Sequence, residues 1–173
     1  MTTTTQAPTA VADHKDLRRA FSLFPSGVTA VCALVGGEPV GLAASSFTTV
    51  SLDPPLVSVA FGNKSRTWAR LREATHIGIS VLAEEHAEYC RVLAGPEAER
   101  FVGVEWSATP EGAVHIGGSA LMLTCSIADV TTAGDHDVAF FTVHEILGQT
   151  PVEPLLFHGS KFRRVADRPN ARR

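Results

Sequence analysis

Between two apolar runs the chain reads Gly41-Leu-Ala-Ala-Ser-Ser-Phe-Thr-Thr-Val-Ser-Leu-Asp-Pro-Pro55. This stretch is rich in small and hydroxyl-bearing residues and almost uncharged, with five serine and threonine side chains between residues 45 and 51. Each hydroxyl that is buried in a core needs a hydrogen-bond partner, so this density is unusual for a core strand. A flat, polar molecule lying against the stretch explains it best. We therefore expect one wall of a ligand site here.

The segments around this stretch carry the apolar patterns of β-strands. Residues 28–35 are apolar on both faces, Gly36-Gly37 forms a turn and residues 40–44 continue the pattern, which predicts a buried hairpin. Further strand patterns cover residues 56–61, 77–81, 121–131, 138–147 and 155–157. Because these strands do not alternate regularly with helices, a doubly wound parallel sheet is disfavoured. The sequence predicts a mainly β protein with a few helices, folded as an antiparallel barrel.

Helical patterns are fewer than strand patterns. Helices are expected over residues 13–24, 65–74 and 84–93, the first two capped by Asp13 and Ser65. Residues 95–118 are irregular and rich in glycine, and we interpret them as a loop that covers or flanks a site.

The 173 residues and the net charge of −3 indicate one ordinary globular domain. We assign it to residues 13–165, between a disordered tail over residues 1–12 and a basic, solvated tail over residues 166–173. The charge gives no reason to expect binding to nucleic acid or to a membrane, and neither a signal peptide nor a membrane span is expected. Three cysteines that lie far apart indicate reduced thiols in a cytoplasmic protein.

Several catalytic motifs are absent from the sequence. It contains no glycine-rich dinucleotide fingerprint, no P-loop and no nucleophile elbow. The sequence therefore gives no support for a Rossmann dinucleotide-binding protein, a P-loop NTPase or a serine hydrolase. The seven histidines show no metal-ligand spacing, so no metal site is expected. His76 and His144 fall within strand patterns and are interpreted as structural residues.

Residues 63–67, Asn63-Lys64-Ser65-Arg66-Thr67, join an apolar strand to the start of a helix. Two hydroxyls, two cations and the backbone N–H groups of a helix start are the donors that a phosphate group requires. An ordinary capped helix with solvated charges is the competing interpretation.

Residues 134–136, Gly134-Asp135-His136, form a turn between the two longest strand patterns. A plain hairpin with a polar tip accounts for glycine and aspartate at this place. An imidazole at the end of a strand can also face a cofactor. Taken together, a smooth polar wall at residues 41–55 followed by a phosphate segment at residues 63–67 suggests a flavin nucleotide.

Five segments of the chain resemble a known family, the short flavin reductases with a flavin-binding split barrel, which are reductase components of two-component flavin-dependent monooxygenases. The matching segments are residues 24–29 (Phe-Pro-Ser-Gly-Val-Thr), 41–55, 63–67, 134–136 and 154–159 (Pro-Leu-Leu-Phe-His-Gly). The resemblance implies an antiparallel split β-barrel (the FMN-binding split barrel) that forms a homodimer.

The resemblance also implies roles for individual residues. The residues that would bind the flavin are Ser26, Gly27, Val28, Thr29, Ala43, Ala44, Ser45, Ser46, Thr49, Val50, Ser51, Asn63, Lys64, Ser65, Arg66, Thr67, Gly134, Asp135 and Phe157. Within this set residues 63–67 would hold the ribityl phosphate, and His136 would orient the nicotinamide as the catalytic residue. The chain departs from the family at Ala43, where threonine is common, and at Phe157 and Phe162, where tyrosine is frequent.

The function implied is that of an NAD(P)H-dependent flavin reductase of the EC 1.5.1 type. Hydride would pass from NADH or NADPH to FMN or FAD, and the reduced flavin would serve a partner monooxygenase. Two alternatives remain at this point: a flavin- or haem-binding split-barrel carrier or sensor without turnover, and a barrel whose hydroxyl-rich stretch serves an interface with another protein.

Overall fold

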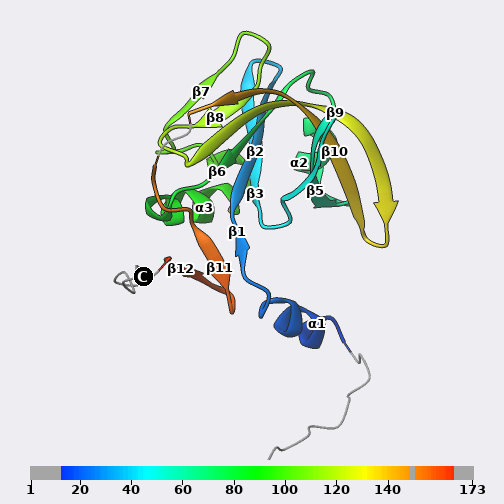
Figure 1. The fold of residues 1–173 in the computed structure, drawn as a ribbon, viewed down its shortest axis with the longest axis vertical. Helices are drawn as coiled ribbons and strands as arrows, with labels where there is room; N and C mark the ends of the chain where they lie inside the picture. Colours follow the sequence, from blue (N-terminus) through cyan, green and yellow to red (C-terminus); the bar gives the residue numbers. More distant parts are fainter. Residues whose placement is uncertain (1–12, 149–150, 166–173) are drawn as a thin grey trace, which may run out of the picture.

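The computed structural model describes residues 13–148 and 151–165, and its main element is a seven-stranded sheet that curls into a barrel (Figure 1). The strands follow the order β3-β2-β6-β9-β10-β5-β4, and every neighbouring pair is antiparallel. Their bounds are β2 (Thr29–Val35), β3 (Glu38–Ala44), β4 (Thr48–Leu52), β5 (Pro55–Gly62), β6 (Ile77–Val81), β9 (Leu121–Ala133) and β10 (His136–Leu147). The mainly β, antiparallel fold predicted from the sequence is therefore confirmed.

The barrel closes along a seam between the two ends of this sheet. Strands β3 and β4 follow one another in the chain but are the first and last strands in the sheet order. Residues 45–47 carry the chain across the seam. There the hydroxyl of Ser46 donates to the carbonyl oxygen of Ala60 on β5 and accepts from the N–H of Ala60, both at 3.0 Å. A side chain thus ties the seam at this place.

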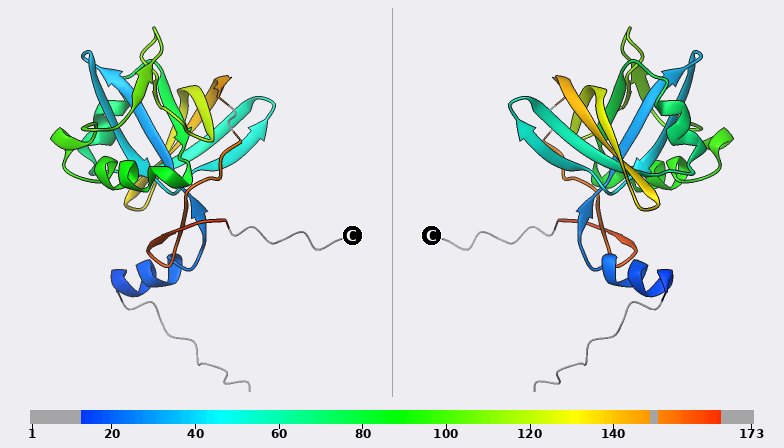
Figure 2. Two further views of the ribbon diagram at one scale, coloured as in Figure 1. Left: turned by 90° about the vertical axis from the view of Figure 1, so that its left-hand side faces the viewer. Right: turned by 90° about the vertical axis from the view of Figure 1, so that its right-hand side faces the viewer.

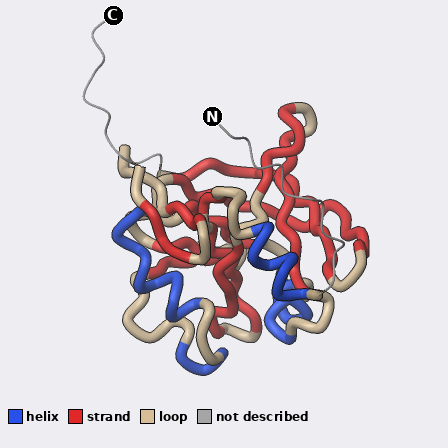
Figure 3. The backbone as a smooth tube through the Cα atoms, turned by 90° about the horizontal axis from the view of Figure 1, so that it is seen from below, coloured by secondary structure: helices blue, strands red, loops and turns tan. Residues whose placement is uncertain are grey.

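The remaining elements surround the barrel. Strands β1 (Ser26–Gly27), β11 (Leu156–His158) and β12 (Lys161–Arg163) form a small sheet, and β7 (Trp106–Ala108) pairs with β8 (Val114–Ile116). The helices are α1 (His14–Phe21), α2 (Arg66–Leu71), α3 (Ala87–Leu93) and the 3₁₀ turns η1 (Glu84–His86) and η2 (Glu97–Glu99). Seen from below, the helices lie outside the strands (Figure 3).

Helix α1 and the small sheet project from the barrel as an arm, which Figure 2 shows from two sides. Asp13 caps α1, as predicted, because its carboxylate accepts from the N–H groups of Lys15 and Asp16. No residue of α1 is buried, and the side chains of Phe21 and Phe24 near its end are 69% and 78% exposed. Exposed aromatic side chains that lie together are typical of a surface that contacts another molecule.

The structure corrects several boundaries that the sequence pattern gave. The first helix ends at Phe21 instead of residue 24, the second ends at Leu71, and the third begins as a 3₁₀ turn. Residues 95–118 are not one loop, because they contain η2 and the β7–β8 hairpin. Strand β4 lies inside the stretch that was interpreted only as a ligand wall. The predicted tails at residues 1–12 and 166–173 lie outside the described residues.

Strand β2 explains why its sequence is apolar on both faces. Val31 and Ala33 point into the barrel, where they belong to a cluster with Trp68 and Phe141. The alternate residue Cys32 packs on the outer side in a second cluster, which includes residues of α3. Alternate side chains of a strand point to opposite faces, and both faces of β2 are covered by other residues. Neither set of side chains therefore needs to be polar.

Helix α2 is docked on the barrel by Trp68. Its indole ring stacks on Phe61 with ring centres 4.2 Å apart and an interplanar angle of 4°. The indole N–H donates to a carboxylate oxygen of Asp137 at 3.0 Å, and the hydroxyl of Thr132 donates to the other oxygen at 2.8 Å. These contacts fix the position of residues 63–67, which precede Trp68 in the chain.

We expect the acid stability of the protein to depend on Asp137. The hydrogen bonds from Trp68 and Thr132, helped by the charge of Arg72, hold the pKa of this carboxyl below its ordinary value. As the pH falls below about 4, the carboxyl of Asp137 is protonated in the unfolded chain before it is protonated in the folded protein. The contribution of Asp137 to folding stability is therefore lost as the pH falls toward its lower pKa in the folded state. When the pH is lowered, the melting temperature of the Asp137→Asn variant should fall less steeply than that of the parent protein. Asp129→Asn, on the exposed part of β9, is the matched control, and equal slopes for all three proteins would contradict the assignment.

No helix in the described ranges has both the length and the apolar character that crossing a membrane demands.

Candidate active site

The end of β3 and the end of β5 enclose a hollow of about 360 Å³. It is lined by Leu42, Ala43, Ala44, Ser45, Ser46, Ala60, Phe61, Gly62 and His136. The structure therefore brings the small residues at 43–46 together with His136, although these segments are about 90 positions apart in the chain. The hydroxyl of Thr29 donates to the carbonyl oxygen of Ala44 at 3.1 Å and fixes this end of β3 to β2.

The backbone of β3 offers donors and acceptors to this hollow. Because β3 is the first strand of the sheet, one of its two edges is not paired with another strand. Arg100 reaches the carbonyl oxygen of Gly41 at 3.1 Å on that free edge. Alternate residues of a strand direct their backbone groups to the same edge, so the N–H and C=O of Ala43 face the same way as those of Gly41. Ala43 lacks a side-chain hydroxyl, and its backbone supplies polar groups in its place.

The two loops at residues 63–67 and 134–136 lie side by side. The N–H of Asn63 donates to the carbonyl oxygen of Asp135 at 3.1 Å, and its side-chain amide donates to that of Gly134 at 3.4 Å. Gly134 has a φ of +66°, which favours glycine at this turn. The imidazole of His136 bonds the carboxylate of Asp135 at 2.8 Å, and this contact lowers the pKa of Asp135. His136 is half exposed at the edge of the hollow.

Within residues 63–67 the two hydroxyls are bonded inside the protein, whereas the two cationic side chains are exposed. The hydroxyl of Ser65 caps α2 by accepting from the N–H of Trp68 at 3.2 Å. The hydroxyl of Thr67 is buried and accepts from Arg100 at 2.7 Å. Asn63, Lys64 and Arg66 are exposed. Helix α2 has only six residues, so an anion here depends on these side chains more than on the helix dipole.

Comparison with known proteins places this arrangement in a family. Residues 21–166 match the family described as the flavin reductase like domain. The chain belongs to this family. The resemblance stated from the sequence is confirmed.

Individual members of the flavin reductase family are similar along most of their length. The reductase subunit of a flavin-dependent monooxygenase from Rhodococcus jostii is 33% identical over 87% of this chain and 77% of its own. An NADH-dependent FAD reductase from Streptomyces globisporus is 36% identical over 92% of this chain and 91% of its own. An NADH:FAD oxidoreductase of that organism, solved with NAD and FAD fragments, superimposes with a TM-score of 0.84 at 36% identity, covering 95% of this chain and all of that one. The fold of this flavin reductase-like domain is accordingly the split barrel.

A second hollow of about 250 Å³ opens on the other side of residues 43–45 in this flavin reductase-like domain. It is apolar and is lined by Val28, Ala43, Ala44, Ser45, Cys90, Arg91, Ala94, Phe157 and Phe162. Phe157 lies opposite Ser26 in the pairing of β11 with β1, but only Phe157 lines this hollow. Burial raises the pKa of the Cys90 thiol to about 11, which makes a reactive thiolate unavailable here.

Several predicted site residues line neither hollow: residues 26, 27, 29, 63–67, 134 and 135, and the three on strand β4. Thr49, Val50 and Ser51 lie on this edge strand, and Val50 is 46% exposed. The side chain of Leu52 is 97% exposed. These residues form a mostly exposed surface on the edge strand of the sheet.

Arg100 is the residue near the site that the sequence pattern did not reveal. Its guanidinium donates to the carbonyl oxygens of Gly95 and Gly41 and to the hydroxyl of Thr67, at 2.9, 3.1 and 2.7 Å. It therefore ties α2, β3 and the segment after α3 to one another. A single arginine in an irregular segment has no local signature, and only its long-range contacts identify it.

Proposed function

We propose that this protein is an NAD(P)H-dependent flavin reductase of the EC 1.5.1 type that supplies reduced FMN or FAD to a partner monooxygenase. The observation that carries the proposal is that residues 43–46 and His136 line one hollow, and that Asn63 is bonded to the turn at residues 134 and 135 that precedes His136. The relatives named above, a monooxygenase reductase subunit and an NADH-dependent FAD reductase, support the same reaction class.

The residues of the hollow fit a flavin nucleotide. Small side chains at residues 43–45 leave room for a planar ring, and the free backbone edge at Ala43 offers hydrogen bonds to its polar rim. Asn63, Lys64 and Arg66 would bind the ribityl phosphate through their amide and cationic groups. A bound flavin supplies the acceptor position for a hydride from the nicotinamide ring.

The work of the protein chain in this reaction is to bind and to orient. Transfer of a hydride is fast only when the binding residues hold the reacting atoms in contact, about 3–3.5 Å apart. The backbone N–H of Ala43, on the free edge of β3, would stabilise the negative charge that develops on the ring during reduction. His136 is held by Asp135 at the open side of the hollow, where it would position the nicotinamide.

The direct test is to add FMN or FAD to the purified protein with NADH or NADPH and to follow the consumption of the nicotinamide. We expect a marked acceleration over a control without protein. A protein that leaves both nicotinamides untouched with both flavins is not a reductase. A yellow protein without turnover would instead be a carrier or sensor.

We expect His136→Ala to lower kcat/KM for NADH by roughly tenfold or more, because the nicotinamide loses an orienting contact. The dissociation constant for the flavin should change by less than about twofold, since His136 lies at the rim. Steady-state kinetics and flavin fluorescence titration measure the two quantities. An unchanged KM together with an unchanged kcat would show that His136 has no role with the nicotinamide.

We also propose that the protein works as a homodimer in the cytoplasm. The exposed aromatic side chains of the arm, Phe21 and Phe24, and the exposed apolar residues of β4 provide surfaces for a second copy. Buried, unpaired cysteines fit a reducing compartment. Sedimentation equilibrium checks the first point, because a dimer has twice the 18.4 kDa mass of the chain.

A further inference from the structure

A buried carboxylate that the proposed function does not use lies next to the site. Asp137 follows His136 in β10, and only 6% of its surface is exposed. One of its oxygens accepts from the indole N–H of Trp68 at 3.0 Å, and the other accepts from the hydroxyl of Thr132 at 2.8 Å. The guanidinium of Arg72 lies 3.8 Å from the carboxylate. Burial of a charge is unfavourable, and these three contacts offset its cost.

The pattern of donors around Asp137 requires a carboxylate rather than any polar group of the same size. Each donor meets a different oxygen, and an ionised carboxyl accepts on both of its atoms. The amide of asparagine accepts on its oxygen but donates from its nitrogen, so it would leave either Trp68 or Thr132 without an acceptor. Asp137→Asn therefore breaks one of the two contacts while it keeps the volume of the side chain.

The two donors come from different parts of the site. Thr132 lies opposite Asp137 in the pairing of β9 with β10, at the base of the turn that leads to His136. Trp68 lies in the first turn of α2, directly after residues 63–67. The carboxylate therefore joins the hairpin that presents His136 to the helix that begins at the proposed phosphate segment.

The same link supports one wall of the hollow. The indole ring of Trp68 stacks on Phe61, and Phe61 lines the hollow together with His136. Asp137 is opposite Phe61 in the pairing of β10 with β5, so their side chains share one face of the sheet. The side chain of His136 leaves β10 on the other face, because successive residues of a strand alternate. A shift of the indole would therefore displace a wall of the hollow and the end of β10 together.

A second link, closer to the turn, joins the same two parts of the site. The N–H of Asn63 donates to the carbonyl oxygen of Asp135 at 3.1 Å, and its side-chain amide donates to that of Gly134 at 3.4 Å. The second of these hydrogen bonds is long and therefore weak. Hydrogen bonds to an ionised group are stronger than those between neutral groups, so the carboxylate of Asp137 makes the stronger link.

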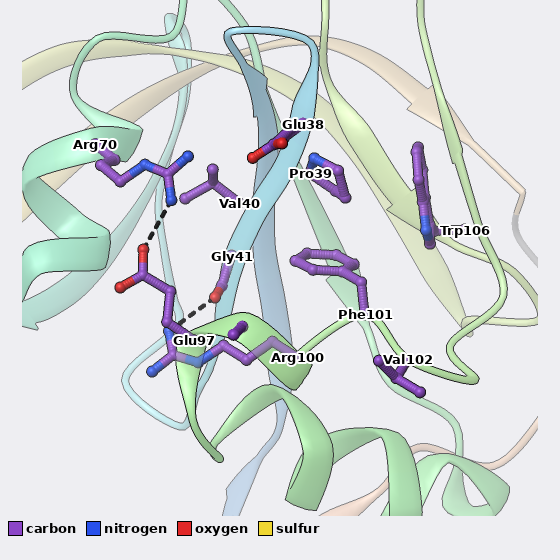
Figure 4. A pocket seen from close by; sticks show the side chains of 11 residues that line it. Glu38, Pro39, Val40, Gly41, Arg70, Glu97, Arg100, Phe101, Val102 and Trp106 are labelled. Atoms are coloured by element: carbon purple, nitrogen blue, oxygen red, sulfur yellow. Dashed lines mark hydrogen bonds and ion pairs between the residues drawn. The ribbon is translucent and has the colours of Figure 1, made fainter.

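Helix α2 also has an anchor that leads away from His136. Arg70 forms an ion pair with Glu97 of η2 at 2.8 Å, and Figure 4 shows this pair in the wall of a separate cavity. The pair joins α2 to η2 rather than to β10. Glu97→Gln therefore removes a polar anchor of the same helix without a change beside His136, which makes it a matched control.

We propose that Asp137 is a positioning residue that fixes His136 relative to the flavin-phosphate segment, an inference that rests on the function proposed above. Asp137 touches neither ligand. It holds the end of β10 against α2, so that His136 and residues 63–66 bind the nicotinamide and the flavin at one fixed separation. A misplacement of about 1 Å between reacting groups can slow a reaction by about a hundredfold.

The test is a double-mutant cycle of Asp137→Asn with His136→Ala. It measures kcat/KM for NADH at a saturating concentration of the flavin that the parent reduces, which removes any contribution from flavin affinity. We expect Asp137→Asn alone to lower kcat/KM roughly tenfold. In the His136→Ala background the same substitution should lower it less than about twofold, because the group through which Asp137 acts is already absent. A residue that only stabilises the fold would cause equal losses in both backgrounds.

A milder pair of variants applies where Asp137→Asn does not fold. Thr132→Val removes the hydroxyl donor at an exposed position and keeps nearly the same shape. We expect it to lower kcat/KM for NADH roughly threefold, and Thr132→Ser, which restores the hydroxyl, should recover most of the parental value. Glu97→Gln should stay within about twofold of the parent. Melting temperatures verify that all variants are folded at the assay temperature.

Three results would overturn the proposal. Equal losses in the two backgrounds would mean that Asp137 does not act through His136. A parental kcat/KM in Asp137→Asn, or in Thr132→Val where Asp137→Asn does not fold, would mean that the carboxylate sets no separation that matters. A His136→Ala protein with parental kinetics would remove the group through which Asp137 is proposed to act. In each case the reductase function stands if the parent oxidises NADH with a flavin. If the parent does not, the function and this inference fail together.

Discussion

The variant Ser45→Trp should lose flavin binding and flavin-dependent NADH oxidation while it keeps its fold. Ser45 is exposed at the end of β3 and lines both hollows next to residues 43 and 44. An indole at this position would occupy the space required by a planar ring, and a ligand that buries most of its surface cannot bind in a filled pocket. We expect the dissociation constant for either flavin to rise by roughly a hundredfold or more.

Fluorescence titration and NADH oxidation measure this loss, and circular dichroism verifies the fold. Ala128→Trp is the matched control, because Ala128 is a small exposed residue on β9 that lines neither hollow. It should keep full activity. If Ser45→Trp binds flavin like the parent, then the ring does not lie against residues 43–46 and the proposed site is wrong.

The variant Gly78→Ala should be strongly destabilised or fail to fold. Gly78 is buried in β6, where it pairs with Cys32 on one side and Thr124 on the other. A Cβ atom at this position would lie 2.0 Å from the carbonyl oxygen of Val114 and 2.6 Å from its carbon. These are backbone atoms of β8, which cannot turn away as a side chain can. We expect a loss of about 3 kcal/mol or more of the free energy of unfolding.

Urea denaturation of the soluble fraction measures the effect of Gly78→Ala, and the yield of soluble protein reports a complete failure to fold. Gly27→Ala is the control, because no atom lies within 4 Å of a Cβ built at Gly27 and its φ is not positive. It should be as stable as the parent. A Gly78→Ala protein with parental stability would mean that β8 does not pack on β6 as described.

The barrel strands could be predicted because their signal is local. The hairpin of β2 and β3 and the long strands β9 and β10 are apolar runs interrupted by glycine turns, and the structure confirms each of them. Strand β4 was not recognised because an exposed edge strand needs no apolar residues, and residues 48–52 are mostly exposed. The β7–β8 hairpin was not recognised because each of its strands has only three residues.

The site could be predicted only in part, because hydroxyls serve the protein as well as a ligand. The density of serine and threonine at residues 45–51 led to the prediction of a ligand wall. The hydroxyl of Ser46, however, is bonded on both sides to Ala60, and that of Thr67 is bonded to Arg100. Neither partner is near in sequence, so local composition could not separate structural hydroxyls from those available to a ligand. The contact of Asn63 with residues 134 and 135 is equally long-range, and no local pattern could predict it.

The seam at Ser46 has a consequence for the release of product. Beside the hollow that contains His136, the loop after β3 is joined to β5 by the two hydrogen bonds between the hydroxyl of Ser46 and the backbone of Ala60. A ligand that enters or leaves beside Ser46 and Ala60 passes a place where the two segments are not joined by paired strands. No row of backbone hydrogen bonds must be broken for passage, and two bonds to one serine can be opened at a cost of only about 1–3 kcal/mol. For the reductase function proposed above, an exit at this place would leave the paired strands of the barrel intact.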